Sequence, residues 1–302
     1  HANGLQNILV SGMGGSGIGA DFVSSFIRQE CNLPLIVSKS YELPEFAGPH
    51  TLAILSSYSG NTEETLNALH QIEQKGCKRI AISSGGKLIE YAKEKGMDYI
   101  QLPTGWPSPR ACLGYSIVSQ MYVLYKLGLI ENHFITQLQR IAKDLQANSG
   151  EIIQRAKHLA SLLESKMVVI YSGDRMEPAA VRFRQQITEN SKMLSWHHVL
   201  PEMNHNELVG WRWNQPALAV VFLRSEEDHP RVQARMELTK EIVSHYTGSM
   251  IDVYGKGSSL LERSFYLVHL LDFVSVFLAD YNKVDATEVR VIDFLKTELS
   301  KL

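Results

Sequence analysis

Short apolar runs that alternate with amphipathic segments constrain the fold of this chain more than any other feature. In the first half, apolar runs lie at 7–11, 34–37, 51–55, 79–82 and 98–102, and segments with helical spacing lie at 18–28, 63–75 and 88–95. Short buried strands that alternate with helices of about a dozen residues build parallel sheets with helices on both faces. The alternation therefore predicts an α/β fold.

A long helical stretch interrupts this alternation near the middle of the chain. Helical spacing continues over 111–127 and 134–163, with a break near Ser149 and Gly150. Strands are then predicted at 167–172, 217–223 and 249–253, with helices at 177–192, 232–246 and 258–281 and a last one ending near 301. A length of 302 residues suits two domains of about 100–200 residues each. We expect domains at 1–150 and 151–302.

Charge and cysteine content exclude several classes of function. Lys and Arg total 30 and Asp and Glu total 32, so the net charge of -2 predicts neither a nucleic-acid partner nor a membrane-surface partner. The cysteines, Cys31, Cys77 and Cys112, form no CxxC pair, which excludes a disulfide framework and a thiolate zinc site. Unpaired cysteines favour a reducing, cytoplasmic compartment.

No apolar run reaches the ~18 residues that a membrane span requires. The longest candidate, 265–278, is interrupted by His269, Asp272 and Ser275, and the run at 7–10 is too short for a signal peptide. We therefore expect a cytoplasmic protein without a membrane partner.

A glycine-rich loop follows the first predicted strand. Residues 12–17, GMGGSG, satisfy the pattern GxGxxG. Dinucleotide binding also needs an acidic residue at the end of the second strand, where this chain has Ser38 and Lys39. A nicotinamide cofactor is therefore disfavoured. Close packing of backbone against helix, or a loop that accepts a sugar, remain the two interpretations.

A serine- and threonine-rich loop gives the stronger signal. Residues 56–65, SSYSGNTEET, connect an apolar strand to an amphipathic helix, so their hydroxyls surround a helix N-terminus. Unpaired N–H groups and the positive end of the helix dipole favour a phosphate there. The alternative is simple capping, with Ser59 or Asn61 as the N-cap and Glu63 or Glu64 reaching back. Capping does not require three hydroxyls and a glycine, so phosphate binding is favoured.

These two loops together resemble the sugar-isomerase (SIS) domain family. The segments PRACLGY at 109–115, TENSK at 188–192 and PEMNHNE at 201–207 further resemble the bifunctional phosphoglucose/phosphomannose isomerases. The resemblance implies two SIS-type domains, each a parallel sheet flanked by helices in a flavodoxin-like three-layer sandwich. It also implies isomerisation of glucose 6-phosphate and mannose 6-phosphate to fructose 6-phosphate through a cis-enediol. Because this chemistry is proton transfer, we expect neither a cofactor nor a metal.

The resemblance also suggests roles for individual residues. The 6-phosphate is expected to contact Ser57, Ser59 and Thr62, with Gly15 and Ser16 of the glycine loop nearby.

Glu189 is the expected base that carries the proton between C1 and C2, and Glu202 and Glu207 are its rivals. His205 is expected to open the sugar ring, since an imidazole exchanges protons near neutral pH. In the family the matching histidine comes from the neighbouring subunit, which implies a homodimer.

Two cations complete the expected site. Arg110 is expected to stabilise the enediolate, and Lys296 resembles a site lysine near the C-terminus of the family. His197 and His198 are adjacent in sequence and are expected to be structural, whereas His229, before a proline, is expected to cap the helix that follows.

Two competing functions are left open. One is a phosphosugar-binding regulatory protein without catalysis, and the other is a nicotinamide-dependent oxidoreductase. An amino sugar as substrate is also compatible with the sequence.

Overall fold

The computed structural model describes residues 2–106 and 108–301. The chain divides into two compact units, His1–His133 and Phe134–Leu302, called unit 1 and unit 2 below. This division lies before the boundary at residue 150 that the sequence suggested, because the two helices of the stretch 134–163 belong to unit 2. These helices are α5 (His133–Ala147) and α6 (Ser149–Leu163), and they break at Asn148, next to the expected position.

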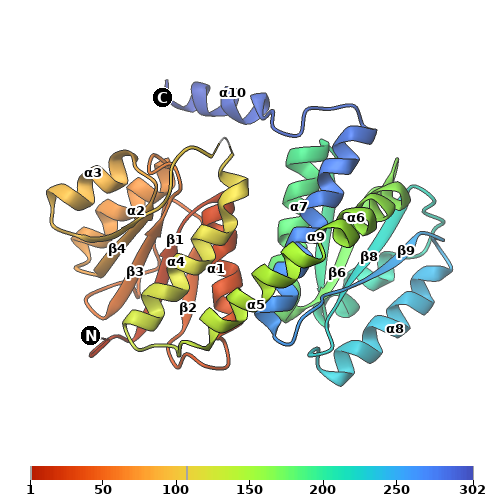
Figure 1. Ribbon diagram of the computed structural model, residues 1–302, viewed down its shortest axis with the longest axis horizontal. Coiled ribbons are helices and arrows are strands. Elements are labelled where there is room, and N and C mark those ends of the chain that lie inside the picture. Colours follow the sequence, from red (N-terminus) through yellow and green to blue (C-terminus); the bar gives the residue numbers. More distant parts are fainter. Residues whose placement is uncertain (1, 107, 302) are drawn as a thin grey trace. The chain divides into compact units, whose positions relative to one another are not determined.

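Unit 1 is a parallel sheet covered by helices on both faces (Figure 1). In the described residues its strand order is β2-β1-β3-β4-β5. The strands are β1 (Asn7–Ser11), β2 (Leu35–Ser38), β3 (Thr51–Ser56), β4 (Lys78–Ser83) and β5 (Asp98–Gln101). The helices are α1 (Gly14–Ile27), α2 (Glu63–Gln74), α3 (Gly86–Glu94) and α4 (Leu113–Lys126). Figure 1 shows α1 and α4 on one face of the sheet and α2 and α3 on the other.

The burial of each strand of unit 1 corresponds to how apolar its sequence is. All six residues of the central strand β3, TLAILS, are buried, since helices cover both of its faces. The edge strand β5 instead has mostly exposed residues. The core beneath α2 and α3 is built from residues such as Leu55, Leu69 and Leu88.

Unit 2 is a second parallel sheet, with the order β7-β6-β8-β9 in the described residues. Its strands are β6 (Met167–Gly173), β7 (Ser195–Leu200), β8 (Leu218–Arg224) and β9 (Met250–Tyr254). The remaining helices are α7 (Glu177–Ser191), α8 (Pro230–Ser244), α9 (Leu260–Tyr281) and α10 (Arg290–Leu299). Helix α9 packs against both α7 and α6 (Figure 1). The α/β fold expected from the sequence is confirmed, although β7, a polar edge strand, was not among the predicted strands.

Helix α9 is long and apolar enough, by length and composition alone, to cross a membrane; it is the one such helix among the described residues. A core helix of a globular unit has the same composition, and 50% of the most apolar window of α9 is buried. The polar residues that interrupt it have partners: Asp272 pairs with Arg182 of α7, and the backbone carbonyl of Ser275 accepts from the Ser191 hydroxyl.

The Arg182–Asp272 pair is a testable part of this packing. Arg182 is buried and donates through Nη2 and Nε to the two carboxylate oxygens, at 2.7 and 3.1 Å. We expect Arg182→Ala to lower the free energy of unfolding by about 2–3 kcal/mol, because it strands a partly buried carboxylate. Urea unfolding followed by circular dichroism measures this. The exposed Arg231→Ala is the control, expected to change stability by less than about 0.5 kcal/mol; equal effects of both variants would contradict the prediction.

Candidate active site

The carboxyl edge of the unit 1 sheet is lined with hydroxyls. The first four strands, β1 to β4, end in a serine: Ser11, Ser38, Ser56 and Ser83. Because the described strands of unit 1 pair in parallel, the loops that follow them lie at the same edge. The glycine loop follows β1 and the serine-rich loop follows β3, so both belong to this edge.

The glycine loop brings the backbone of α1 close to the serine-rich loop. A Cβ on Gly12 would lie 2.7 Å from the carbonyl oxygen of Ser56, and one on Gly17 would lie 2.5 Å from the carbonyl oxygen of Gly12. Helix α1 begins at Gly14 without a side-chain cap and without an acidic residue in its first turn. Its first N–H groups and its positive dipole end are therefore suited to an anion near Gly15 and Ser16.

The serine-rich loop is held by its own hydroxyls. Ser57 Oγ lies 2.8 Å from Thr62 Oγ1 and accepts from the Gly60 N–H at 3.1 Å. Ser57 is buried, whereas Ser59 is exposed and its Oγ accepts from the Asn61 N–H. The N-cap of α2 is Thr62, whose side chain makes no capping bond. The simple capping interpretation, with Ser59 or Asn61 as the N-cap of α2, is therefore wrong.

Asn61 has a different structural role. Its Oδ1 accepts from the Lys87 N–H at 3.1 Å, so it caps the neighbouring helix α3. Gly60 lies against the loop after β4, because its Cβ would be 1.8 Å from the carbonyl oxygen of Gly85. The hydroxyl of Ser84 also donates to the Tyr58 carbonyl at 2.6 Å.

This second polar loop, SSGG at residues 83–86, was not among the site segments predicted from the sequence. Its signal was present, because it repeats the order of the first loop: an apolar strand, two serines, a glycine and a helix.

Arg110 lies in a short helical turn, Pro109–Cys112, next to the glycine loop. A Cβ on Gly15 would be 3.3 Å from the carbonyl oxygen of Pro109. The Tyr58 hydroxyl donates to the Pro103 carbonyl at 3.0 Å, and burial and a hydrogen bond with Cys112 raise the pKa of Tyr58. The glycine loop, the serine-rich loop and the Arg110 turn are thus brought together in unit 1.

In unit 2 the structure separates the two expected acid–base residues. Glu189 is half-buried in the last turn of α7, and His205 is exposed in the turn that follows β7. Helix α7 runs antiparallel to the strands, so Glu189 lies at their amino ends and His205 at their carboxyl ends. The length of β7 separates these edges by about 17 Å, at ~3.3 Å per residue. Glu189 and His205 of one chain therefore do not form a pair.

The neighbours of His205 all hold structural contacts. The Asn204 amide donates to Thr239 Oγ1 at 2.9 Å, and the Asn206 amide donates to Glu202 Oε1 at 2.8 Å. Glu207 Oε1 accepts from Tyr171 and Trp196. In each of the carboxylates that rivalled Glu189 as the base, Oε1 therefore accepts a hydrogen bond from a neighbouring side chain.

The remaining residues singled out from the sequence are Lys296 and three histidines, His197, His198 and His229. Lys296 is exposed in α10, a helix without buried residues. His197 Nε2 lies 3.8 Å from Glu177, and His198 Nδ1 accepts from the Val199 N–H. His229 accepts from the Arg231 N–H at the start of α8, which confirms the expected cap.

The carboxyl edge of the unit 2 sheet differs from that of unit 1 in its chemistry. Arg263 pairs with Glu227, and Arg224 pairs with Glu237 at 2.7 Å. The Asp228 carboxylate fills the space beside Gly173, where a Cβ would be 2.6 Å from its Oδ1, and burial raises the pKa of Asp228. Charge pairs occupy this edge where unit 1 presents hydroxyls.

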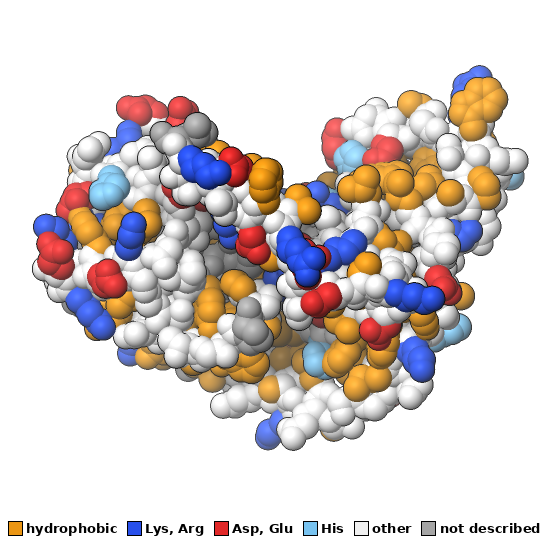
Figure 2. Space-filling view, turned by 90° about the horizontal axis from the view of Figure 1, so that it is seen from above, with side chains coloured by type: hydrophobic (Ala, Val, Ile, Leu, Met, Phe, Trp, Pro, Cys, Tyr) orange, Lys and Arg blue, Asp and Glu red, His pale blue; other side chains and the backbone are white. Residues whose placement is uncertain are grey.

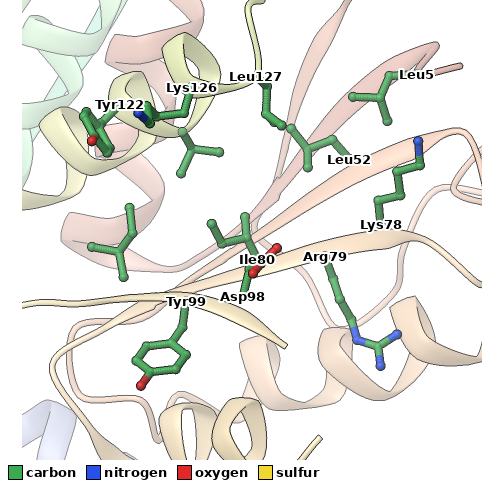
Figure 3. A pocket seen from close by; sticks show the side chains of 12 residues that line it. Leu5, Leu52, Lys78, Arg79, Ile80, Asp98, Tyr99, Tyr122, Lys126 and Leu127 are labelled. Atoms are coloured by element: carbon green, nitrogen blue, oxygen red, sulfur yellow. The ribbon is translucent and has the colours of Figure 1, made fainter. Parts of the chain in front are cut away.

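A cavity of about 510 Å³ lies elsewhere in unit 1 (Figure 3). Lys78 and Asp98 line it at the amino ends of β4 and β5, and Tyr122 and Lys126 line it from α4. It is therefore at the edge opposite the serine-rich loop and takes no part in the candidate site.

Neither the face shown in Figure 2 nor the metal-ligating side chains of the described residues add a candidate site. On the face shown in Figure 2, Lys and Arg side chains lie among Asp and Glu side chains. Within residues 2–106 and 108–301, no group of three or more His, Cys, Asp and Glu residues is arranged to hold a metal ion.

Comparisons with known proteins agree with this architecture. Residues 152–299 match a family model described as the C-terminal SIS domain of bacterial phospho-glucose isomerase. A bifunctional phosphoglucose/phosphomannose isomerase of Caldicellulosiruptor bescii is 39% identical, over 100% of this chain and 91% of its own. One from Aquifex aeolicus is 38% identical over 98% and 91%. The C-terminal domain of a glucosamine-fructose-6-phosphate aminotransferase from Francisella tularensis superposes with a TM-score of 0.79, 13% identity, and coverage of 95% and 87%.

Gly60 offers a direct test of the serine-rich loop. Gly60 has φ +70°, and any Cβ there would clash with the Gly85 carbonyl. We expect Gly60→Ala to shift the loop and to weaken binding of a hexose 6-phosphate roughly tenfold or more, measured by titration calorimetry. Gly150→Ala, where nothing lies within 4 Å, is the matched control and should bind as the wild type does. Unchanged affinity in Gly60→Ala would place the phosphate elsewhere.

Proposed function

Because this chain belongs to the family of bifunctional phosphoglucose/phosphomannose isomerases, we propose that it interconverts glucose 6-phosphate and mannose 6-phosphate with fructose 6-phosphate. The observation that carries the proposal is the 39% identity that spans 100% of the chain. The matched region thus includes the serine-rich loop of unit 1 and the Glu189 and His205 segments of unit 2.

The phosphate is proposed to bind at the carboxyl edge of unit 1. Ser57, Ser59 and Thr62 offer hydroxyls there, and the first N–H groups of α1, next to Gly15 and Ser16, offer further donors. The geometry supports this phosphate site, because neither α1 nor α2 has a side-chain cap that competes for the N–H groups of its first turn. The Ser16 N–H donates to the Met13 carbonyl, so the N–H groups before it are the α1 donors proposed for the anion. Holding the substrate by its phosphate fixes the positions of C1 and C2 relative to the protein.

Ring opening is proposed to use His205. The imidazole transfers a proton between the C1 hydroxyl and the ring oxygen, the C1–O5 bond breaks, and the open-chain aldehyde forms. An exposed histidine turn, whose neighbours are engaged in structural bonds, suits this role.

Proton transfer is proposed to use Glu189. Its carboxylate removes the proton from C2, the C–H electrons form the C1=C2 bond, and the carbonyl oxygen becomes an enediolate oxygen. The same carboxyl group then returns the proton to C1 while the proton of the O2 hydroxyl moves to the enediolate oxygen O1, so that a ketone forms at C2 and a hydroxyl at C1. Arg110 is proposed to stabilise the enediolate charge, and Lys296 to line the site. A cofactor or metal is not needed for any of these steps.

The separation of Glu189 and His205 within unit 2 supports a homodimer. Residues about 17 Å apart along a sheet cannot both reach C1 and C2 of one hexose from the same chain. We therefore propose that His205 of one subunit acts with Glu189 of the other. The three free cysteines suit a reducing compartment such as the cytoplasm.

The activity is tested with glucose 6-phosphate and, separately, mannose 6-phosphate, each with EDTA present. We expect fructose 6-phosphate from both substrates, because proton transfer needs no metal. Turnover of only one of the two substrates would support the same mechanism in an isomerase that is specific for that substrate. If neither reacts while a hexose 6-phosphate still raises the melting temperature, the protein is a phosphosugar-binding regulator instead.

The roles and subunit origins of Glu189 and His205 can be tested together. We expect Glu189→Gln to lower kcat by about 10³-fold, because the amide cannot accept the proton, with substrate affinity nearly unchanged. Mixing Glu189→Gln chains with His205→Ala chains should restore roughly a quarter of wild-type turnover, since half of randomly paired dimers are mixed and each regains one site.

The mixing experiment has clear contrary outcomes. No recovery in mixed dimers would mean that both residues of a site come from the same chain. Full activity of Glu189→Gln would remove Glu189 from the mechanism.

A further inference from the structure

Glu207 lies two residues after His205 and contacts a buried aromatic cluster. Its Oε1 accepts from the Tyr171 hydroxyl at 2.5 Å and from Trp196 Nε1 at 3.2 Å. Trp211 Nε1 donates to the same Tyr171 oxygen at 2.9 Å. The Glu207 carboxylate therefore joins the turn that carries His205 to strands β6 and β7. Through Tyr171 it is also linked to Trp211.

The cluster is rigid because it belongs to the core. Tyr171 is 0% exposed and packs edge-to-face on Phe222 of β8, with ring centroids 5.6 Å apart. Trp211 is also buried, and Met203, two residues before His205, is 0% exposed in the same core. The His205 turn is thus anchored on both sides, by an apolar side chain before it and by a carboxylate after it.

The chemistry of these hydrogen bonds indicates that Glu207 fixes the position of the His205 turn and does more than satisfy buried polar groups. Buried Tyr and Trp groups need one polar partner each, and neutral groups would suffice. Here a carboxylate accepts two bonds, which are stronger when the acceptor is ionised. Burial, and then Glu207, raise the pKa of Tyr171 well above its usual range, so the phenol keeps the proton that it donates.

We propose that Glu207, held by Tyr171 and Trp196, is a positioning residue that fixes the His205 imidazole for ring opening. This inference rests on the proposed role of His205. Because the Oε1 of Glu207 accepts both bonds from the cluster, we assign Glu207 a positioning role and not proton exchange with the substrate. Misplacing a reacting group by about 1 Å can cost roughly 100-fold in rate, so loss of this anchor should act on turnover.

The decisive comparison is between Glu207→Ala and Glu207→Gln. The amide oxygen of glutamine can still accept from Tyr171 and Trp196, whereas alanine removes the acceptor. We expect Glu207→Ala to lower kcat roughly 30- to 100-fold with KM within about twofold, because the phosphate is held in unit 1. Glu207→Gln should keep kcat within about fivefold of the wild type. If glutamine is as damaging as alanine, Glu207 acts as an acid or base and the proposal is wrong.

Trp196→Phe is the milder variant, for use if Glu207→Ala does not fold. It removes one donor and keeps the Tyr171 bond, so kcat should fall roughly threefold. Trp213→Phe, at a tryptophan that is 72% exposed, is its matched control and should leave kcat unchanged. Equal kcat values for these two variants and the wild type would contradict the proposal.

Hydrogen exchange of the 201–211 segment separates the inference from the function on which it rests. We expect faster exchange of this segment in Glu207→Ala than in Glu207→Gln and the wild type. Faster exchange with unchanged kcat would overturn the positioning role while leaving the isomerase activity in place. Unchanged exchange in Glu207→Ala would overturn the anchor itself. If the wild-type chain isomerises neither substrate, the proposed function fails, and the exchange result alone then decides whether Glu207 anchors the turn.

Discussion

Parallel pairing of the strands is the constraint on which the candidate site depends. Within each unit the strands of the described residues all pair in parallel, so each loop that follows a strand lies at one edge of the sheet. In unit 1 this brings Gly12, Ser57 and Arg110 to one edge, although they are far apart in the sequence. In unit 2, helix α7 runs antiparallel to the strands, so its last turn, which carries Glu189, lies at the amino edge of the unit 2 sheet.

The two units share one architecture, but their strand ends differ in chemistry. Four strands of unit 1 end in serine, and α1 and α2 begin without side-chain caps, which leaves N–H donors of their first turns available to an anion. In unit 2 the corresponding edge is occupied by Arg263–Glu227 and by Asp228 beside Gly173. The His205 turn lies at this edge, and the hydrogen bond from Tyr171 to Glu207 anchors it.

Most strands could be predicted because buried parallel strands are continuous apolar runs. The central strand β3, TLAILS, is buried throughout, and its signal was correspondingly clear. Strand β7, SWHHVL, was missed because an edge strand with half-exposed residues needs no apolar run. Asn61 shows the same limit within the site: its sequence position suggested a cap for α2, but its side chain caps α3, a contact set by the approach of two loops.

The sequence by itself determined the alternation of strands and helices, the two hydroxyl- and glycine-rich loops, and the polar turn that carries His205. These features depend on local composition and spacing, which a sequence displays directly. Only the tertiary structure decided that Glu189 and His205 lie at opposite edges of one sheet, and that Glu207 contacts Tyr171, 36 residues away. Such contacts depend on strand order and helix direction, and side-chain type alone does not encode which distant partner will be near.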